Sequence, residues 1–316
     1  MINTRMSTSA YSEGIIKNIY ANRNTLTKMQ EQLSSNSQIS TMSDNPTDAM
    51  EILKVDSSLT NISAYLNNIS AASGELDLAD TTLSSLTTLV QDASDIATQA
   101  SSSATYNHDN LVALKAKLDQ IIQSVKELGN TKYKDTYIFA GQNTNTAPFS
   151  DSSTGVGVVY NGSLSTEDYQ RKVTVSDGVS ETINVAGDTI FGSYSYDETT
   201  DTETGSGLMK SLCQLSRMLD ADPPDYDSIR SQIDELDSAS STVIEQRAKL
   251  GAINSRLTIT ETQLSTQKTN LTAKRKELKE PDLVELISDM TAQETTLQAS
   301  LQVTSSIMGL SMLNYL

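Results

Sequence analysis

The chain of 316 residues contains very little of the residue types that bind metals and carry redox chemistry. It has one cysteine, Cys213, and one histidine, His108. A single cysteine excludes an intrachain disulfide and any zinc site built from several thiolates, and a single histidine excludes every metal site that needs two imidazoles. We therefore expect no metal, no cofactor and no catalytic residue, and we do not expect an enzyme.

Aromatic residues are also scarce. There is no Trp, there are 3 Phe, and aromatics make up 5% of the chain. Hydrophobic residues account for 37%, whereas about 45–50% is usual for globular chains. Because so little apolar surface is present, we expect thin cores in an elongated protein, or a chain that is partly disordered alone.

Positive charge is in short supply. The chain has 23 Lys and Arg and 40 Asp and Glu, which gives a formal net charge of −17. This balance disfavours binding to nucleic acid, which needs basic patches, and adsorption to anionic membrane. Residues 1–14 lack the apolar core of a secretory signal, and the sequence has no run of 18 apolar residues. We therefore predict no cleaved signal peptide and no membrane span.

Glycine is sparse outside the middle of the chain, since ten of the 14 lie between Gly129 and Gly207. Sparse glycine with apolar residues spaced by three and four predicts long helices at both ends, and dense glycine with Val, Tyr and Thr predicts strands and turns. The predicted fold is mainly α with a β insertion. It is an elongated multi-helix coiled-coil rod with N- and C-terminal helices paired and a central β-rich domain.

The first predicted helix carries a heptad stripe, which indicates a seam facing another helix along its length. Its members are Ile15, Ile19, Asn22, Leu26, Met29, Leu33 and Asn36. The polar Asn22 either sets the register of the pair or faces solvent and sets nothing. Asn36 suits a left-handed bend, and an extended link through 39–43 follows.

A second helix is predicted to start at Pro46, which fits the first helical position, with Asn45 as its cap and Asp48 in its first turn. Its apolar seam continues to about Ala100. A third helix with the same spacing is predicted over 111–128, ending at Gly129. The short connection between the two helices predicts antiparallel neighbours.

The last third of the sequence has an apolar residue every seven positions. These residues are Ile229, Leu236, Val243, Leu250, Leu257, Leu264, Leu271 and Leu278. The companion heptad positions are mostly polar, so we expect a narrow ridge that lies along the second and third helices. Pro281 is predicted to occupy the first position of a new helix. Its stripe is Leu283, Ile287, Met290, Leu297, Leu301 and Met308.

The middle region predicts strands. Residues 137–141 are predicted to form one strand, and 171–185 a hairpin whose three-residue loop, 176–178, places its valines on one face. Residues 196–207 are polar and acidic, which predicts an exposed loop with no calcium spacing. Cys213 is expected to be a small buried residue, and His108 a surface residue in a turn.

Two segments resemble the flagellin superfamily. The Ser43–Pro46 stretch is similar to its Ser-Asp-Asp-Pro segment, and 247–257 is similar to its R-x-x-L-G-A-x-x-N-R-L stretch. Residues 137–149 and 310–316 are closer to the junction-protein branch than to filament flagellin. The matching motif residues are Asp44, Asn45, Pro46, Arg247, Leu250, Gly251, Ala252, Arg256 and Leu257.

The resemblance implies an exported structural subunit of the bacterial flagellum. On this resemblance, we expect it to form a junction ring between hook and filament and to reach the cell exterior by the flagellar type III route. The expected partners are other copies of itself, an adjacent hook-associated protein, flagellin and an export chaperone. Filament flagellin, an unrelated coiled-coil binding protein and a phage structural protein are the alternatives. The expected assembly residues are apolar members of the terminal stripes: Ile15, Ile19, Leu26, Met29, Leu33, Leu297, Leu301, Met308, Leu310, Leu313 and Leu316.

The expected domains follow the same division. Residues 1–43 and 281–316 are terminal coiled-coil assembly segments that are disordered in the monomer. Residues 44–131 and 226–280 form the helical rod domain, and 132–225 form the β-rich outer domain.

Overall fold

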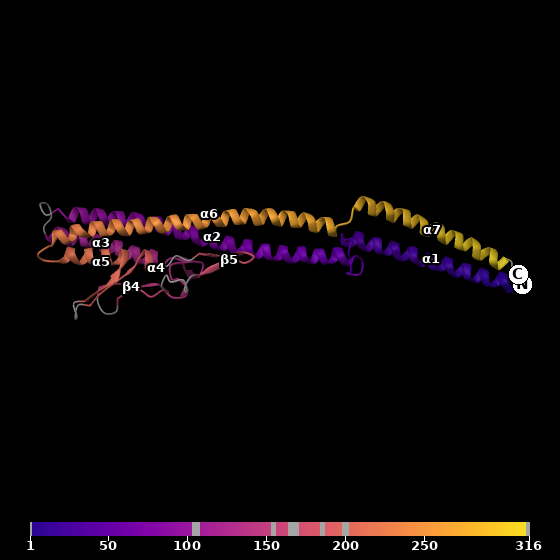
Figure 1. The fold of residues 1–316 in the computed structure, drawn as a ribbon, viewed down its shortest axis with the longest axis horizontal. Helices are drawn as coiled ribbons and strands as arrows, with labels where there is room; N and C mark the ends of the chain where they lie inside the picture. The colour runs from indigo at the N-terminus through magenta and orange to yellow at the C-terminus, as the bar shows by residue number, and fades with distance from the viewer. Residues whose placement is uncertain are drawn as a thin grey trace. The chain divides into compact units, whose positions relative to one another are not determined.

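A computed structural model describes residues 2–102, 108–152, 156–163, 171–183, 187–197 and 202–313. For residues 2–12, 108, 156 and 307–313 it describes the backbone alone. Five long helices dominate it (Figure 1): α1 (Ile2–Ser35), α2 (Pro46–Ala100), α3 (His108–Gly129), α6 (Tyr226–Lys279) and α7 (Leu283–Leu313). The predicted mainly α fold with a β insertion is confirmed.

The chain divides into two compact units. The first comprises the described residues of 1–62 and 266–316, and the second those of 63–265. Both α2 and α6 contribute residues to each unit. In the first unit, α1 and α7 lie side by side and run antiparallel (Figure 1), so the predicted pairing of the terminal helices is confirmed.

The helices of the second unit bury the predicted heptad ridge. Ile229, Leu236, Val243, Leu250 and Leu257 of α6 are all less than 5% exposed. In the same unit, Leu83 and Leu86 of α2 and Leu111 and Leu118 of α3 are also fully buried. In the first unit the same ridge weakens, because Leu271 is only half-buried. Because mostly polar residues flank the ridge, the core along α6 depends on these few leucines and valines.

A further helix, α5 (Gly207–Asp220), lies inside the predicted β-rich region. It packs against α3 and against the strands. Its apolar face is completely buried, with Leu208, Met209, Leu212, Leu215 and Leu219 at 0% exposure. The region 132–225 therefore combines strands with a helix that the sequence interpretation did not include.

The strands form three small antiparallel sheets. A four-stranded sheet has the order β3 (Phe149–Asp151), β4 (Val156–Tyr160), β7 (Ser193–Asp197), β8 (Thr202–Ser206). Strands β1 (Lys132–Tyr133) and β2 (Thr136–Tyr137) pair, as do β5 (Lys172–Ser176) and β6 (Val179–Thr182), and α4 (Gly187–Ile190) is one short turn. All three phenylalanines of the chain meet here, with ring centroids of Phe139 and Phe149 each 5.1 Å from that of Phe191.

Several local predictions for this region are wrong. The strand expected over 137–141 ends after Tyr137, and the loop expected over 196–207 contains the end of β7 and all of β8. In the β5–β6 hairpin, Ser176 pairs with Val179, so the turn has two residues, and a bulge falls between Thr174 and Ser176. The bulge turns Val175 into the core while Val179 stays 46% exposed. Val185 lies outside the described residues.

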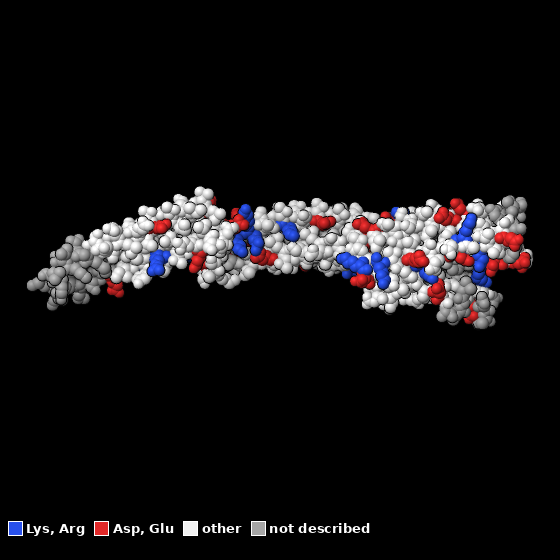
Figure 2. Space-filling model, turned by 180° about the vertical axis from the view of Figure 1, so that it is seen from behind, with Lys and Arg blue, Asp and Glu red and all other residues white. Residues whose placement is uncertain are grey.

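Charged side chains of both signs lie next to one another over the helices (Figure 2). Most of the ion pairs are at least partly exposed, such as Lys126–Asp151 at 2.8 Å. Such pairs contribute little to stability, typically about 0–1 kcal/mol each. The cohesion of both units therefore rests on the apolar seams.

Candidate assembly interface

The seam between α1 and α7 is the surface expected to mediate assembly, and it is only partly closed. On α1, the predicted stripe residues Ile15, Ile19, Leu26, Met29 and Leu33 are all half-buried. Asn22 lies among them, and the Gln293 side-chain amide donates to the Asn22 carbonyl and Oδ1 at 3.4 and 3.3 Å. Asn22 therefore faces a partner on α7, and the alternative in which it faces solvent is wrong.

The α7 side of the seam has a different register from the predicted stripe. Its inward residues are Leu286, Met290, Gln293, Leu297, Ser300 and Thr304. Met290 and Leu297 were predicted correctly, but Leu283, Ile287 and Leu301 are 44%, 48% and 51% exposed. Three of the five inward positions after Leu286 are polar, so the spacing of apolar residues alone does not identify the inward face of α7. The side chains of Met308, Leu310 and Leu313, and the whole of Leu316, lie outside the described residues.

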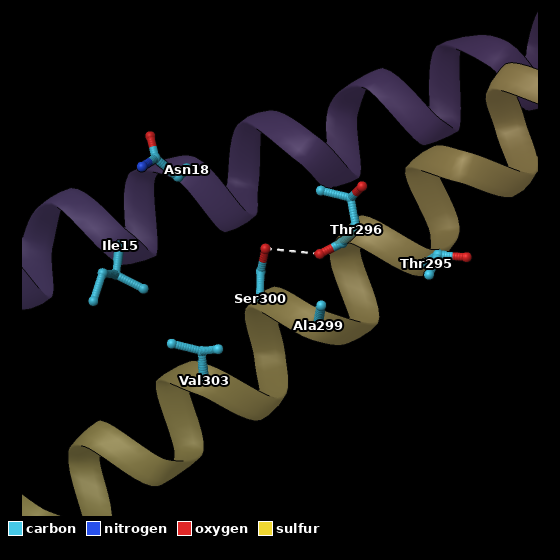
Figure 3. Close-up of a pocket in the computed structure, with 7 residues that line it drawn as sticks. All are labelled: Ile15, Asn18, Thr295, Thr296, Ala299, Ser300 and Val303. Atoms are coloured by element: carbon cyan, nitrogen blue, oxygen red, sulfur yellow. Dashed lines mark hydrogen bonds between the residues drawn. The ribbon is translucent and has the colours of Figure 1, made fainter.

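A groove of about 460 Å³ opens between the two helices near their free ends. Figure 3 shows Ile15 and Val303 on facing helices, with Asn18 and Ala299 farther along. Ser300 turns its hydroxyl back onto the Thr296 carbonyl at 2.7 Å and so does not bridge to α1. In this stretch the pair of helices leaves apolar and polar side chains accessible to a third element.

The link between α1 and α2 is tightly organised by the motif residues Asp44 and Asn45. Asp44 accepts hydrogen bonds from Lys28 Nζ at 2.8 Å and from the backbone N–H groups of Thr41 and Ser40 at 2.9 and 3.1 Å. Asn45 Oδ1 accepts from the Asp48 N–H at 3.2 Å, which caps α2 as predicted. The left-handed bend predicted at Asn36 is present, with φ of 49°.

The same link is attached to the end of α6. Gln38 donates its backbone N–H to the Lys279 carbonyl at 2.8 Å and its side-chain amide to the Leu278 carbonyl at 2.7 Å. These two bonds satisfy carbonyls at the C-terminus of α6 that would otherwise lack partners. No local pattern around Gln38 indicates this role, because the contact joins distant parts of the chain.

Replacing Asp44 with asparagine is expected to destabilise the first unit and to remove part of its acid sensitivity. The Lys28 ammonium and the Thr41 N–H hold the pKa of Asp44 well below its usual range. A depressed pKa contributes stability above about pH 4, the ordinary Asp value, and that contribution is lost as the pH falls further. Thermal unfolding at pH 7 and pH 3.5 should show a smaller difference for Asp44→Asn than for wild type. The control is Asp289→Asn, at an exposed position of the same unit, and an equal effect of both variants would contradict the prediction.

Some motif residues of α6 make ion pairs or are buried within this chain, and the others are exposed on its surface. Arg247 binds Asp80 of α2, with Nε 2.9 Å from Oδ1, and Arg256 pairs with Glu181 of β6, which is 6% exposed. Leu250 and Leu257 are buried. Gly251 and Ala252 are exposed, and a Cβ added at Gly251 would meet no atom within 4 Å. The packing of this chain therefore explains four of the six motif residues on α6 and leaves Gly251 and Ala252 facing outward.

The α7 boundary differs slightly from prediction. Asp282, and not Pro281, caps the helix, because its Oδ1 accepts the N–H groups of Val284 and Glu285 at 2.9 and 3.3 Å. Pro281 stands just outside the helix, where it prevents α6 from continuing.

The one cysteine of the chain is unreactive in this fold. Cys213 is buried, as expected, and burial raises the pKa of its thiol to about 12, so it stays protonated and unreactive. His108 is the first residue of α3, so the prediction that it lies in a turn is wrong, and its side chain lies outside the described residues. Within the described ranges, no three His, Cys, Asp or Glu side chains gather as a metal site, and no helix is long and apolar enough to cross a membrane.

Comparison with known proteins identifies both ends of the chain. Residues 2–144 match the bacterial flagellin N-terminal helical region, and residues 233–316 match the bacterial flagellin C-terminal helical region. No curated protein sequence matches the chain.

Solved structures share the fold at low sequence identity. The flagellar hook associated protein-3 of Legionella pneumophila is 14% identical, with 72% of this chain and 98% of that chain covered at a TM-score of 0.62. FlgL of Xanthomonas campestris is 16% identical, with 70% and 98% covered at a TM-score of 0.57. FlgL of Bacillus cereus is 21% identical, with 71% and 99% covered at a TM-score of 0.55.

Proposed function

Because this chain belongs to the flagellin family, we propose that it is the structural subunit of the ring that joins hook to filament in the bacterial flagellum. As a member of this family it is a structural protein and not an enzyme. The observation that carries the proposal is the fold shared over about 70% of the chain with hook associated protein-3 and FlgL structures, together with terminal helices that pair as a coiled coil.

The incomplete seam between α1 and α7 supports an assembly role for the chain ends. The stripe residues of α1 are half-buried and not fully buried, and the groove beside Ile15 and Val303 stays open. Exposed apolar residues on the outer side of α7 include Leu283, Val284 and Ile287. Neighbouring subunits would bury these side chains, which favours polymerisation over a free monomer.

The expected assembly residues Ile15, Ile19, Leu26, Met29, Leu33 and Leu297 form the inner contact in this proposal, and Leu301 contacts a neighbouring subunit. We assign the same outer role to the terminal residues Met308, Leu310, Leu313 and Leu316 from their apolar sequence. Before assembly, residues 1–43 and 281–316 would be disordered and protected by an export chaperone. Export by the flagellar type III route, and contacts with an adjacent hook-associated protein and with flagellin, belong to the same proposal.

Deletion of the gene tests the proposal. Cells without the protein are expected to make hooks, to lack filaments and to release flagellin into the medium, because the ring that anchors the filament is missing. Labelled protein should appear in electron micrographs as a band at one axial position. A label along the whole filament, or long homopolymers from the purified chain alone, would instead identify a filament flagellin.

A further inference from the structure

The four-stranded sheet of the second unit has two edges, β3 and β8, which differ in how the described residues cover them. At the β3 edge, the Asn130 side chain accepts the Phe149 N–H at 3.0 Å and donates to the Phe149 carbonyl at 2.9 Å. A side-chain amide that bonds to both the N–H and the C=O of one residue makes the same pair of hydrogen bonds as a neighbouring antiparallel strand would. This edge is therefore closed to further strands.

The opposite edge is β8, which α5 contacts and beyond which no described strand lies. All five of its residues are exposed, and within the described part of the chain no strand pairs with its outer side. Exposed edges are commonly protected by Lys, Pro or a bulge, and β8 contains no Lys or Pro and pairs with β7 in regular register. Its one charged residue, Glu203, binds Gln214 and Arg217 of α5. The β8 edge is thus available for strand addition.

The end of β8 leads into a polar groove of about 430 Å³ between α5 and α6. Hydroxyl and amide groups line most of it, and its charged residues are one lysine and one glutamate. The lining residues are Gly205, Ser206, Gly207, Lys210, Ser211, Gln214, Ser231, Gln232, Glu235, Ser238, Ala239 and Thr242. Such a surface suits a polar, uncharged occupant that both donates and accepts hydrogen bonds.

The side chain of Gln232, which lines this groove, has an acceptor that no described residue satisfies. Gln232 is 6% exposed, and among the described residues its Oε1 has no hydrogen-bond partner. A buried acceptor without a donor destabilises a fold, and since Gln232 lines the groove, a turn of its side chain toward the groove would bring Oε1 to a donor that enters there. The N–H group of a peptide meets that need, and the regular donors and acceptors of an extended peptide match the open edge of β8.

We propose that β8 and the α5–α6 groove bind an extended segment of a second copy of this chain. This inference rests on the proposed function, since identical subunits are neighbours around a ring. Two chains that each carry a net charge of −17 repel one another. The groove has one basic and one acidic side chain, so a contact there adds no net negative charge to the interface. The contact is heterologous, with the β8 edge of one copy receiving a different segment of the next, and such contacts form a ring when the rotation between neighbouring copies closes.

Site-specific photocrosslinking in assembled flagella tests this contact. A photoreactive phenylalanine analogue replaces Thr204 on β8 in the full chain, and the control places it at Ser180, an exposed residue of β6. After irradiation, the Thr204 position is expected to yield an adduct of two copies and Ser180 none. An adduct with a different protein, or no adduct from Thr204, would overturn the inference.

A second pair of variants tests the groove itself. Ser238→Trp fills the groove and should reduce the Thr204 adduct at least tenfold, whereas Ser241→Trp changes an exposed residue outside the lining and should leave the adduct unchanged. Equal adduct yields from the two variants would contradict the role of the groove, provided that both melt like wild type. The position of labelled protein is scored separately. A junction band without an adduct rejects only this inference, and a missing band rejects the proposed function.

Discussion

Replacing Leu257 with alanine is expected to lower the free energy of unfolding of the second unit by about 2–4 kcal/mol. Leu257 is 1% exposed and belongs to the single apolar ridge of α6. The companion heptad positions are mostly polar, so α6 itself offers few apolar side chains that can fill the cavity. Chemical denaturation followed by circular dichroism measures the loss directly.

The matched control is Ile259→Ala on the same helix. Ile259 is 57% exposed, and a substitution at such a surface position should change stability by less than about 0.5 kcal/mol. If the two variants unfold at the same denaturant concentration, Leu257 does not pack in the core and the heptad register of α6 is wrong.

Replacing Leu297 with glutamate is expected to separate α7 from α1 and to prevent incorporation into flagella. Leu297 lies on the inward face of α7, one helical turn from the Gln293 that bonds to Asn22. A carboxylate there loses the apolar contact and brings an unpaired charge into the seam. Hydrogen exchange should show faster exchange across α1, and the amount of incorporated protein should fall at least tenfold.

Val284→Glu provides the comparison, because Val284 is on the same helix but 81% exposed. It should leave the exchange of α1 amides unchanged, whatever it does to contacts with neighbouring subunits. Protection of α1 that survives Leu297→Glu would mean that the α1–α7 seam is not held by its apolar residues.

The long helices were predictable because their signals are local and repeated. Pro46 marks the start of α2 and Gly129 the end of α3, and the seven-residue spacing from Ile229 identified a ridge that the structure buries. On α7 the same reasoning failed, since Gln293, Ser300 and Thr304 occupy inward positions that hydrophobicity does not reveal.

The middle region was harder to predict for a different reason. Helix α5 has apolar residues at 208, 212, 215 and 219, which is a helical spacing. The pattern is short and lies between a polar loop and two prolines, so it does not stand out in the sequence. The bulge at Val175 and the hydrogen bonds from Asn130 to Phe149 depend on tertiary contacts, which no local pattern records. For the candidate interface, the sequence supplied the α1 stripe, and only the structure identified Gln293 as the partner of Asn22.

The bond from Gln38 to Leu278 spans 240 residues, and the bond from Gln293 to Asn22 spans 271. Contacts of such high order form late, because both partners must be present and a long loop must close before any energy is gained. During synthesis, α1 therefore cannot pair until α7, the last helix of the chain, has been made. If the chain passed through a channel with its N-terminus first, α1 would emerge unpaired. The pairing of α1 with α7 would then form only after the last residues had emerged.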